Sequence, residues 1–386
     1  MTKRKVCVVI GSRANYGSIK SAMRAIDAHP GLELQVVLAA SALLDRYGEA
    51  ARIIESDGFR ADAKVHMLIE GETTVTMAKS TGLALLELPT IFANLEPDFV
   101  ITVGDRFETM ATAVAAAYMN IPLAHTMGGE VTGTIDESVR HAVTKLAHIH
   151  FPANEAAAER IVRMGEERSR VHVVGCPRID VVAEIVAEEA DFSDLHLVEV
   201  EGVGGSIDLD QPFLLVAQYP VTTEYGRGEA QIAETLAALK ELDIPSIVLW
   251  PNPDAGSEDV ARGIRKFRER ESHEHIRFFK NFPVETYIRL LGRCACVIGN
   301  TSSAIREGPF LGTPSVNVGS RQGGRDRGAN VLDAGYERDE IVAAVRRQLA
   351  HGRYPSEHIY GDGRAGERIA EVLARVEVDI QKRLTY

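Results

Sequence analysis

The stretch CACVIGNTSSAIREG, residues 294–308, joins an apolar run of strand length to a polar turn and then to the start of a helical pattern. The cysteine, valine and isoleucine residues of the run favour a buried strand. The polar turn predicts the N-terminus of a helix, because it consists of the small residues Asn300, Thr301, Ser302 and Ser303. A strand, a turn and a helix in this order form the repeating unit of a parallel α/β sheet.

The same order recurs along the chain. Apolar, β-branched runs predict strands in the first half at residues 5–11, 32–40, 98–105, 121–126, 148–153 and 170–175. Further runs predict strands in the second half at residues 212–218, 244–250, 275–280, 294–300 and 313–319. Helix-length segments such as 18–29 and 155–165 separate them. We therefore predict an α/β protein with parallel sheets covered by helices.

The length of the chain and a break in this pattern predict two domains. At 386 residues, of which 45% are hydrophobic, the chain can form two cores of ordinary size. Residues 185–211 lack periodicity and include nearly all of the glycine-rich stretch EGVGGSIDLDQP (201–212). We expect one Rossmann-like domain at residues 1–185 and a second at 186–386, and the last helix could pack back on the first domain.

The composition argues against several classes of protein. A net charge of −12 and a pI near 5.5 disfavour nucleic-acid binding, which generally needs a basic face. The opening MTKRKVCVVIG reaches glycine too early for a signal peptide, and no stretch approaches the roughly 20 apolar residues of a membrane span. We expect a soluble cytoplasmic protein. The four cysteines form no C-x-x-C pair and are expected to be buried and structural.

Polar segments follow six of the predicted strands. A turn at a strand end is polar for structural reasons alone, but ligands of such sheets also bind beyond the carboxyl ends of the strands. The six segments are GSRANYG (11–17), GDRFE (104–108), HTMGGE (125–130), QYPVTTE (218–224), PNPDAG (251–256) and GNTSSAIREG (299–308). Together they predict a binding cleft between the two halves.

The turn at 299–308 carries the clearest signal for an anion. An ordinary N-cap would look the same, but free N–H groups and the positive end of the helix dipole would also face a phosphate there. Arg321 follows the next strand and could supply a guanidinium, and Glu307 could accept from two ribose hydroxyls. We predict a site for a nucleoside diphosphate. No Walker-type or G-x-G-x-x-G motif follows the first strand, which disfavours ATP hydrolysis and dinucleotide redox chemistry.

The stretch HTMGGEVTGTIDESVRH, residues 125–141, concentrates titratable groups just past another predicted strand. Glu137 is interpreted as pairing with His141, four residues on, or as complementing the helix dipole. Asp136 is a stronger candidate for chemistry, because Asp105 lies at the end of a plausibly neighbouring strand. Two such acids could meet over a substrate and divide the acid and base roles.

These segments together resemble the hydrolysing UDP-N-acetylglucosamine 2-epimerases, over nearly the whole chain and in the same order. The resemblance implies a two-domain, glycosyltransferase-B-like fold with a UDP-sugar in the cleft and no metal or other cofactor. It implies release of UDP and N-acetylmannosamine for sialic acid-type synthesis. The motifs that carry it are GSRANYG, GDRFE, GGEVTGTIDESVRHAVTKLAHIHF, PVTTE, PNPDAG, GNTSSAIREG, GSRQGGR and IYGDG.

The resemblance also implies roles for individual residues. It implies acid and base chemistry from Asp105 and Asp136, and we add Glu130 as a third catalytic candidate. His125 and Tyr219 are further candidates for substrate binding. Contacts with UDP are implied for a set of residues from both halves: Arg13, Arg106, Asn252, Asn281, Thr301, Ser302, Glu307 and Arg321.

Two positions depart from the family pattern. Members often carry a glutamate where this chain has Met127, which cannot transfer a proton, and a histidine where it has Tyr219. Glu130 or Tyr219 could compensate, or the enzyme could take a modified sugar such as a 2,4-diacetamido-6-deoxy hexose. Two other classes stay open. A UDP-sugar glycosyltransferase would share the fold but leave the paired acids unexplained, and a catalytically silent nucleotide-sugar sensor would fit both departures. We also expect a homo-oligomer, a dimer or a tetramer.

Overall fold

The computed structural model describes residues 3–44, 50–70, 73–132, 135–188, 202–251, 256–271 and 274–385. These residues form two compact units. Unit 1 lies within Met1–Val131, Ile135–Ala183 and Tyr360–Tyr386, and unit 2 lies within Thr132–Thr134 and Glu184–Ile359. The last helix of the chain therefore belongs to unit 1. No helix in the described part of the chain is both long and apolar enough to cross a membrane.

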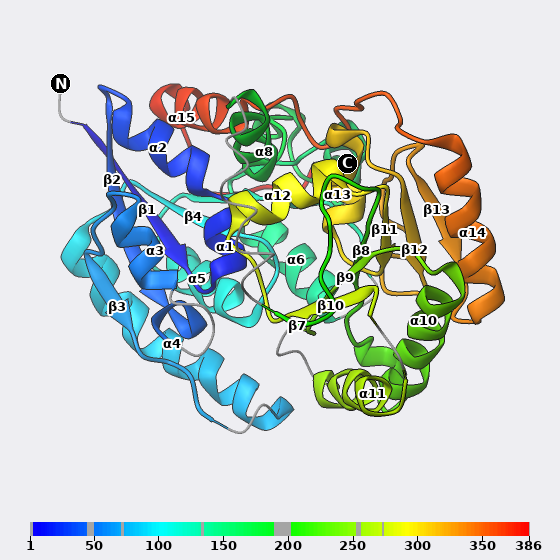
Figure 1. Ribbon diagram of the computed structural model, residues 1–386. Helices are drawn as coiled ribbons and strands as arrows, with labels where there is room; N and C mark the ends of the chain where they lie inside the picture. The colour runs from blue at the N-terminus through cyan, green and yellow to red at the C-terminus, as the bar shows by residue number, and fades with distance from the viewer. Residues whose placement is uncertain are drawn as a thin grey trace. The chain divides into compact units, whose positions relative to one another are not determined.

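Unit 1 is built on a six-stranded sheet in the order β3-β2-β1-β4-β5-β6 (Figure 1). The described strands of this sheet all pair in parallel, as predicted. The strands are β1 Arg4–Ile10, β2 Leu32–Ala39, β3 Ala63–Val65, β4 Phe99–Val103, β5 Leu123–Thr126 and β6 Ile149–Phe151. Five of them fall on predicted runs, whereas the short β3 was not predicted.

The strand predicted at residues 170–175 is wrong. Only Val171 pairs with a strand residue, through an isolated bridge to His150 in β6. His172 N then donates to His150 O (2.9 Å), but Gly175 has a φ of +92° and turns the chain towards the next helix. The β-branched run therefore lies along the edge of the sheet without forming a strand.

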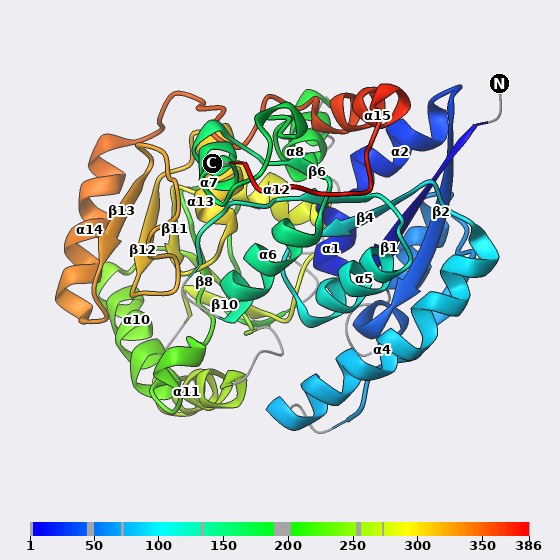
Figure 2. The same ribbon diagram turned by 180° about the vertical axis from the view of Figure 1, so that it is seen from behind.

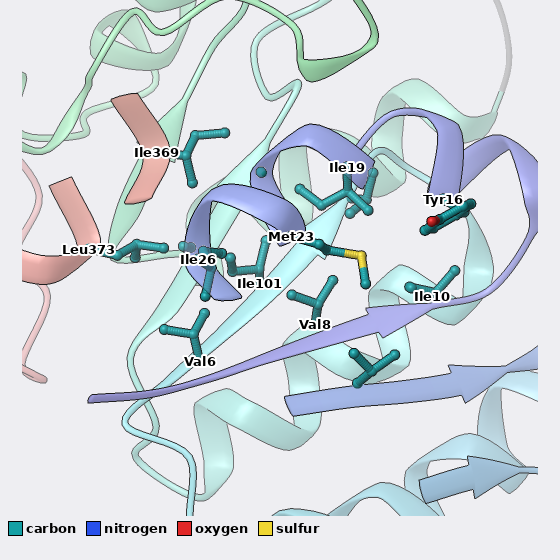
Figure 3. Close-up of a cluster of buried hydrophobic side chains, with 14 of the residues drawn as sticks. Val6, Val8, Ile10, Tyr16, Ile19, Met23, Ile26, Ile101, Ile369 and Leu373 are labelled. Atoms are coloured by element: carbon teal, nitrogen blue, oxygen red, sulfur yellow. The ribbon is translucent and has the colours of Figure 1, made fainter. Parts of the chain in front are cut away.

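Helices cover both faces of this sheet. Successive residues of a strand point to opposite sides, so a strand that is apolar throughout needs cover on both faces. Val6, Val8 and Ile10 of β1 pack with α1, α2 and α15 (Figure 3), whereas Cys7 and Val9 pack with residues of α4, α5 and α6. The helices of this unit are α1 Arg13–Gly17, α2 Lys20–Ala28, α3 Ala50–Ser56, α4 Thr74–Leu95, α5 Phe107–Tyr118, α6 Ile135–Leu146, α7 Glu155–Arg163 and α15 Ala365–Arg375. The next helix, α8 (Pro177–Ala187), carries the chain out of unit 1.

Unit 2 is built on a seven-stranded sheet in the order β13-β12-β11-β8-β9-β10-β7. Only the terminal pair, β10 with β7, is antiparallel among the pairings of the described strands. The strands are β7 Val203–Gly204, β8 Leu214–Ala217, β9 Ser246–Leu249, β10 Ile276–Phe279, β11 Cys296–Gly299, β12 Ser315–Val318 and β13 Val331–Ala334. The five strands predicted for this half are confirmed, and β7 and β13 are additional.

The helices of unit 2 are α10 Gly228–Leu242, α11 Ser257–Arg270, α12 Val284–Arg293, α13 Ser303–Leu311 and α14 Arg338–His351. Residues of α10, α11 and α14 pack against one face of the sheet in a single apolar cluster. All four cysteines are buried, as predicted, and none forms a disulfide; Cys294 precedes β11 and Cys296 is its first residue. Burial raises the pKa of the Cys294 thiol to about 12, so this side chain is inert at neutral pH.

Both sheets reverse their strand order at a corresponding place. In unit 1 the reversal falls between β1 and β4, and in unit 2 it falls between β8 and β11 (Figures 1 and 2). Loops that follow neighbouring parallel strands diverge at such a point and leave room for a ligand beyond the carboxyl ends. Six of the predicted site residues follow these four strands, at the place where ligands of doubly wound sheets bind: Arg13, Asp105, Arg106, Tyr219, Thr301 and Ser302.

Candidate active site

The carboxyl ends of β1 and β4 are tied together by one side chain of unit 1. Asn15 Nδ2 donates to Val103 O at the end of β4 (3.2 Å), and Asn15 Oδ1 accepts from Gly11 N (3.2 Å). Ser12 caps α1 by accepting from Asn15 N (3.1 Å). Arg13, a predicted UDP contact, is partly exposed in the first turn of this helix. The segment that follows β1 is therefore held in one conformation beside β4.

Arg140 organises the acidic residues of unit 1. This arginine, on α6, is buried; it donates to Glu130 O (2.7 Å) and forms an ion pair with the carboxylate of Asp105. Asp105, at the end of β4, keeps 23% of its side chain exposed and so remains accessible to a substrate. Glu130 itself is buried, in the segment after β5. A single guanidinium thus joins the ends of β4 and β5 to α6.

Asp136 lies one helical turn before Arg140 in the first turn of α6 and is partly exposed. Residues four apart lie on the same face of a helix, so Asp136 is on the face that carries the contact with Asp105. Its neighbour Glu137 pairs with His141 Nε2 (3.5 Å), which confirms the structural interpretation of that acid. Asp136 is thus distinguished from Glu137 by the face of α6 on which it lies.

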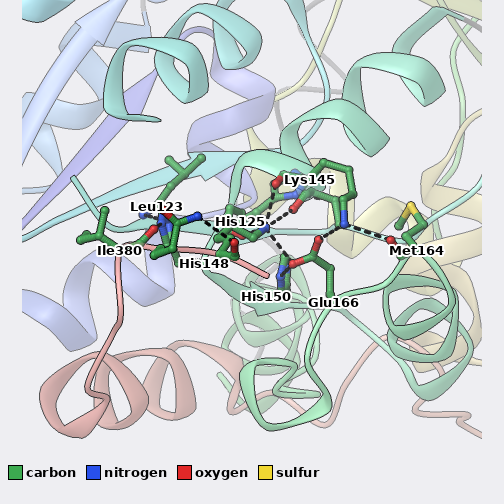
Figure 4. Close-up of polar contacts among 12 residues, drawn as sticks. Leu123, His125, Lys145, His148, His150, Met164, Glu166 and Ile380 are labelled. Carbon is green, nitrogen blue, oxygen red and sulfur yellow. Dashed lines mark hydrogen bonds and ion pairs between the residues drawn. The ribbon is translucent and has the colours of Figure 1, made fainter. Parts of the chain in front are cut away.

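His125 supports the strand ends instead of presenting a ring nitrogen to solvent. Its side chain is fully buried, Nε2 lies 2.9 Å from Gly104 O, and Nδ1 lies 3.2 Å from Thr144 Oγ1 (Figure 4). The carbonyl can only accept, so Nε2 carries the proton and Nδ1 accepts from the threonine. Burial lowers the pKa of His125 to about 4, which keeps the ring neutral. We therefore assign His125 to supporting the loop, which corrects its expected role as a substrate contact.

The GDRFE segment contains a second ion pair, between Arg106 and Glu108. Arg106 Nε lies 3.2 Å from Glu108 Oε1, and Glu108 is buried whereas Arg106 is 45% exposed. A side chain at Gly11 would collide with Glu108, since an added Cβ would lie 2.3 Å from its Cγ. The glycine after β1 therefore makes room for the carboxylate that holds Arg106 at the reversal of the sheet.

Met127, the first departure from the family pattern, has an unusual backbone. Its φ of +62° lies in the left-handed region, which a side chain with a Cβ rarely adopts. Its side chain packs against the apolar cluster around β1. The thioether therefore fills a hydrophobic position, and this packing offers no proton donor at residue 127.

In unit 2, Asn300 clamps the ends of β8 and β11 together. Its Oδ1 accepts from Tyr219 N (2.7 Å) and its Nδ2 donates to Tyr219 O (2.8 Å). The preceding Gly299 has a φ of +124°, and a Cβ there would lie 2.3 Å from Ala217 O. Glycine is required because the two strand ends approach closely. Asn300 is thus a clamp between strands, which corrects its predicted place in the helix cap.

The helix after this clamp begins as predicted but is not capped as predicted. Helix α13 begins at Ser303, and Ser302 precedes it with a helical backbone and no side-chain capping bond. Thr301 Oγ1 instead accepts from Ser303 N (3.3 Å). Ser302 is partly exposed at this N-terminus, and Glu307 is buried one turn into the helix. The predicted anion-binding residues therefore gather at one helix end.

Arg321 lies beside the same turn. Its Nη1 donates to Asn300 O (3.1 Å), and its guanidinium carbon lies 5.4 Å from the centre of the Tyr219 ring. Gln322 Nε2 donates to the same carbonyl (2.8 Å). The structure thus brings together Tyr219, Asn300 and Arg321, which lie far apart in the sequence. This arrangement places a cation and an aromatic ring beside the N-terminus of α13.

One other predicted UDP contact, Asn281, lies away from this cluster. Asn281 is exposed in the loop after β10, two positions from β8 in the sheet, where its Oδ1 accepts from Phe282 N (2.9 Å). Asn252 falls outside the described residues. Within the described ranges, no group of three or more His, Cys, Asp or Glu residues is arranged to hold a metal ion.

Sequence reasoning missed Arg140 and Gln322. The signal for Arg140 was present, because an arginine four residues after Asp136 must share its helix face. Gln322 stood beside Arg321 in the GSRQGGR segment, but nothing in the sequence showed that its amide would turn to Asn300. Both residues act by holding other groups, a role that depends on contacts across the fold.

Two doubly wound α/β units with polar residues at the carboxyl edges of their sheets define a protein of the glycosyltransferase-B-like class. The family model described as UDP-N-acetylglucosamine 2-epimerase matches residues 24–374. This chain belongs to that family, which confirms the resemblance of its motifs.

Similar proteins match nearly the whole length of the chain. A Legionella pneumophila protein named UDP-N,N'-diacetylbacillosamine 2-epimerase (hydrolyzing) is 31% identical, covering 98% of this chain and 97% of that protein. A UDP-N-acetylglucosamine 2-epimerase from Neisseria meningitidis is also 31% identical, over 99% and 98%. A crystal structure of UDP-GlcNAc 2-epimerase from Neisseria meningitidis bound to UDP-GlcNAc has a TM-score of 0.80 at 17% identity, covering 96% of this chain and 99% of that one. The structural likeness confirms the predicted fold.

Proposed function

We propose that this protein is a hydrolysing 2-epimerase that converts UDP-N-acetylglucosamine, or a related UDP-2-acetamido sugar, to UDP and the C2-inverted free sugar. N-acetylmannosamine would be the product from UDP-N-acetylglucosamine. The observation that carries the proposal is the set Asp105, Asp136 and Arg140 at the carboxyl edge of the unit 1 sheet. The name of the Legionella pneumophila relative, which includes hydrolysis, supports it.

The chemistry explains why two acids are needed. The C2 proton of the sugar is not next to a carbonyl, so direct abstraction is too unfavourable. Departure of UDP takes the electron pair of the C1–O bond and leaves positive charge at C1, which acidifies C2–H. A base then removes this proton and its bonding pair forms the C1=C2 bond of a glycal. Water adds its hydroxyl at C1, and a proton delivered to the opposite face of C2 gives the inverted sugar.

We assign the proton transfers to Asp105 and Asp136. A positioned carboxylate typically contributes a factor of about 10²–10⁴ to such a step. Arg140 fixes the Asp105 carboxylate and does not titrate, because a guanidinium stays protonated in proteins. Glu130 stays a third candidate, since its backbone is held by the same arginine.

We assign the departing diphosphate to unit 2. Oriented N–H groups at the end of α13 and the guanidinium of Arg321 would stabilise the negative charge that develops on the leaving oxygen. Ser302 and Thr301 lie at this helix end, and Glu307 one turn further could accept from ribose hydroxyls. From unit 1, Arg13 and Arg106 are the candidates to add positive charge.

One observation favours a second candidate function, a nucleotide-sugar sensor without catalysis. Met127 fills an apolar position where family members often carry a glutamate, and Tyr219 stands where they often carry a histidine. Such a protein would bind a UDP-sugar through unit 2 and leave it unchanged. The packed thioether of Met127 is the feature that favours it.

Product analysis with single UDP-sugars separates these functions. The protein is incubated with UDP-N-acetylglucosamine, and separately with UDP-N,N'-diacetylbacillosamine, in the absence of any acceptor. We expect UDP and a free C2-inverted sugar from at least one of them, identified by chromatography and proton NMR. Binding without turnover of either sugar would favour the sensor, and a free sugar with unchanged C2 configuration would contradict epimerisation.

A further inference from the structure

Tyr287 of α12 reaches the first residue of α13, Ser303. Its hydroxyl forms a short hydrogen bond with Ser303 Oγ, and Ser303 Oγ in turn lies 2.8 Å from Thr301 Oγ1. Ser303 and Thr301 are both buried. Three hydroxyl groups from two elements therefore form a continuous chain that ends at the proposed diphosphate site.

The directions of these three hydrogen bonds decide whether a hydroxyl proton is left to donate to a ligand. A hydroxyl has one proton to donate and two lone pairs to accept with. Thr301 Oγ1 already accepts from Ser303 N (3.3 Å). If Tyr287 donates to Ser303 and Ser303 donates to Thr301, both lone pairs of Thr301 are occupied. The proton of Thr301 is then directed away from the chain and towards an incoming acceptor.

The surroundings of Tyr287 keep its own proton in place. Burial raises the pKa of this phenol above its ordinary range, and the neighbouring Tyr219 and Glu307 act in the same direction, which outweighs the opposite effect of its hydrogen bonds with Ser303 and Thr301. The hydroxyl is therefore a donor throughout the neutral range. The same two neighbours belong to the cluster assigned to the nucleotide, so Tyr287 lies within its electrostatic reach.

We propose that Tyr287 is a positioning residue of the nucleotide site, which orients the hydroxyls of Ser303 and Thr301 so that Thr301 donates to a phosphate oxygen of the UDP group. This inference rests on the proposed function, since it takes UDP as the ligand of unit 2. It adds a residue whose effect on the ligand is indirect, through two hydrogen bonds.

The test is Tyr287→Phe, which removes the hydroxyl and keeps the ring. Tyr354→Phe is the matched control, because Tyr354 OH also donates to a side chain of unit 2, Gln348 Oε1 (2.8 Å), and lies outside the loop. Calorimetry should show UDP affinity reduced about three- to tenfold in Tyr287→Phe, the size of one net hydrogen bond, and unchanged in Tyr354→Phe. In turnover assays KM should rise by the same factor while kcat stays within about twofold, since the lost bond is made equally to bound substrate and transition state.

A double-mutant cycle distinguishes positioning from general destabilisation. If Tyr287 acts through Ser303, then Tyr287→Phe combined with Ser303→Ala should bind UDP no more weakly than Ser303→Ala alone. Additive losses, or wild-type affinity in a folded Tyr287→Phe protein, would overturn the positioning role and leave the proposed function standing. If Tyr287→Phe does not fold, unchanged UDP affinity in Ser303→Ala overturns the role equally. Failure of the unaltered protein to bind UDP would overturn both.

Discussion

The two units share a sheet topology but differ in the side chains at their carboxyl edges. Unit 1 places the carboxylates of Asp105 and Asp136 there, whereas unit 2 places the amide of Asn300, the hydroxyls at the start of α13 and the guanidinium of Arg321. Proton transfer requires groups that titrate, and binding of a diphosphate requires fixed donors. The same topology therefore provides a similar binding position at the carboxyl edge of each sheet, and the side chains there determine its chemistry.

The largest expected effect comes from removing an acid of unit 1. Asp136→Asn should lower turnover by about 100-fold or more, because a positioned acid or base contributes at least that much, while UDP affinity stays the same. Asp105→Asn should behave alike. Glu137→Gln is the control, since Glu137 pairs with His141 and should be dispensable. Steady-state kinetics with UDP calorimetry would measure both properties, and near-normal turnover in both aspartate variants would remove them from the mechanism.

The second effect concerns the residue that holds these groups. Arg140→Met should lower the free energy of unfolding by about 1.5–3 kcal/mol, since it removes charged hydrogen bonds to Asp105 and to Glu130 O. Arg346→Met, in an exposed pair with Glu241, should cost about 0–1 kcal/mol. Urea unfolding would compare the two variants. Equal stability would show that Arg140 does not organise the edge of unit 1.

The third effect tests the binding role of unit 2. Arg321→Ala should weaken UDP binding by about 1.5–3 kcal/mol, the range for a lost charged hydrogen bond. Arg338→Ala is the control, because Arg338 is half-exposed and pairs on the surface with Asp339. Calorimetry would compare the UDP affinities of the two variants. Wild-type affinity in Arg321→Ala would remove this residue from the site.

The last effect is a difference in acid stability. Burial lowers the pKa of a set of histidines in unit 1, and the unfolded chain would protonate them more readily than the folded chain. For His125 the pKa falls from 6.5 to about 4, so stability should decrease as the pH falls through this interval. Glu166, bonded to His150, Lys145 and Lys382, has a pKa lowered to about 2, and its contribution should be lost below about pH 4.5.

The single tryptophan, Trp250, reports on unit 2 and makes this difference measurable. Circular dichroism should begin to change at a higher pH than Trp250 fluorescence, because the titrating histidines lie in unit 1. Glu166→Gln should remove the part of the pH dependence below about pH 4.5. Coincident transitions in both signals would show that the two units do not differ in acid stability.

The sequence predicted the parts of the fold that local pattern determines. The run 98–105 contains five consecutive buried residues, 99–103, that are mostly apolar on both faces, so it was recognisable as a strand. The run 170–175 has the same local character but pairs with the sheet at one bridge, and β3, β7 and β13 have two to four residues each. Pairing with a neighbour is a tertiary property, which a single segment does not carry.

The candidate site was predictable to a similar extent. Strand-end position pointed to Asp105 and Arg321 without an alignment, because ligands of doubly wound sheets bind there. The same reasoning placed Asn300 in a helix cap, whereas its amide bridges two strand ends, and it offered His125 as a substrate contact although both ring nitrogens face protein groups. Partners distant in sequence decide these roles.

The central claim is that C2 of the sugar loses its proton and regains one from the opposite face. Turnover in heavy water tests it most directly, with the released sugar analysed by mass spectrometry and proton NMR. We predict an inverted sugar that carries deuterium at C2, because the returning proton comes from a group that exchanges with solvent. An inverted product without deuterium at C2 would contradict the elimination mechanism, and an uninverted product would contradict epimerisation itself.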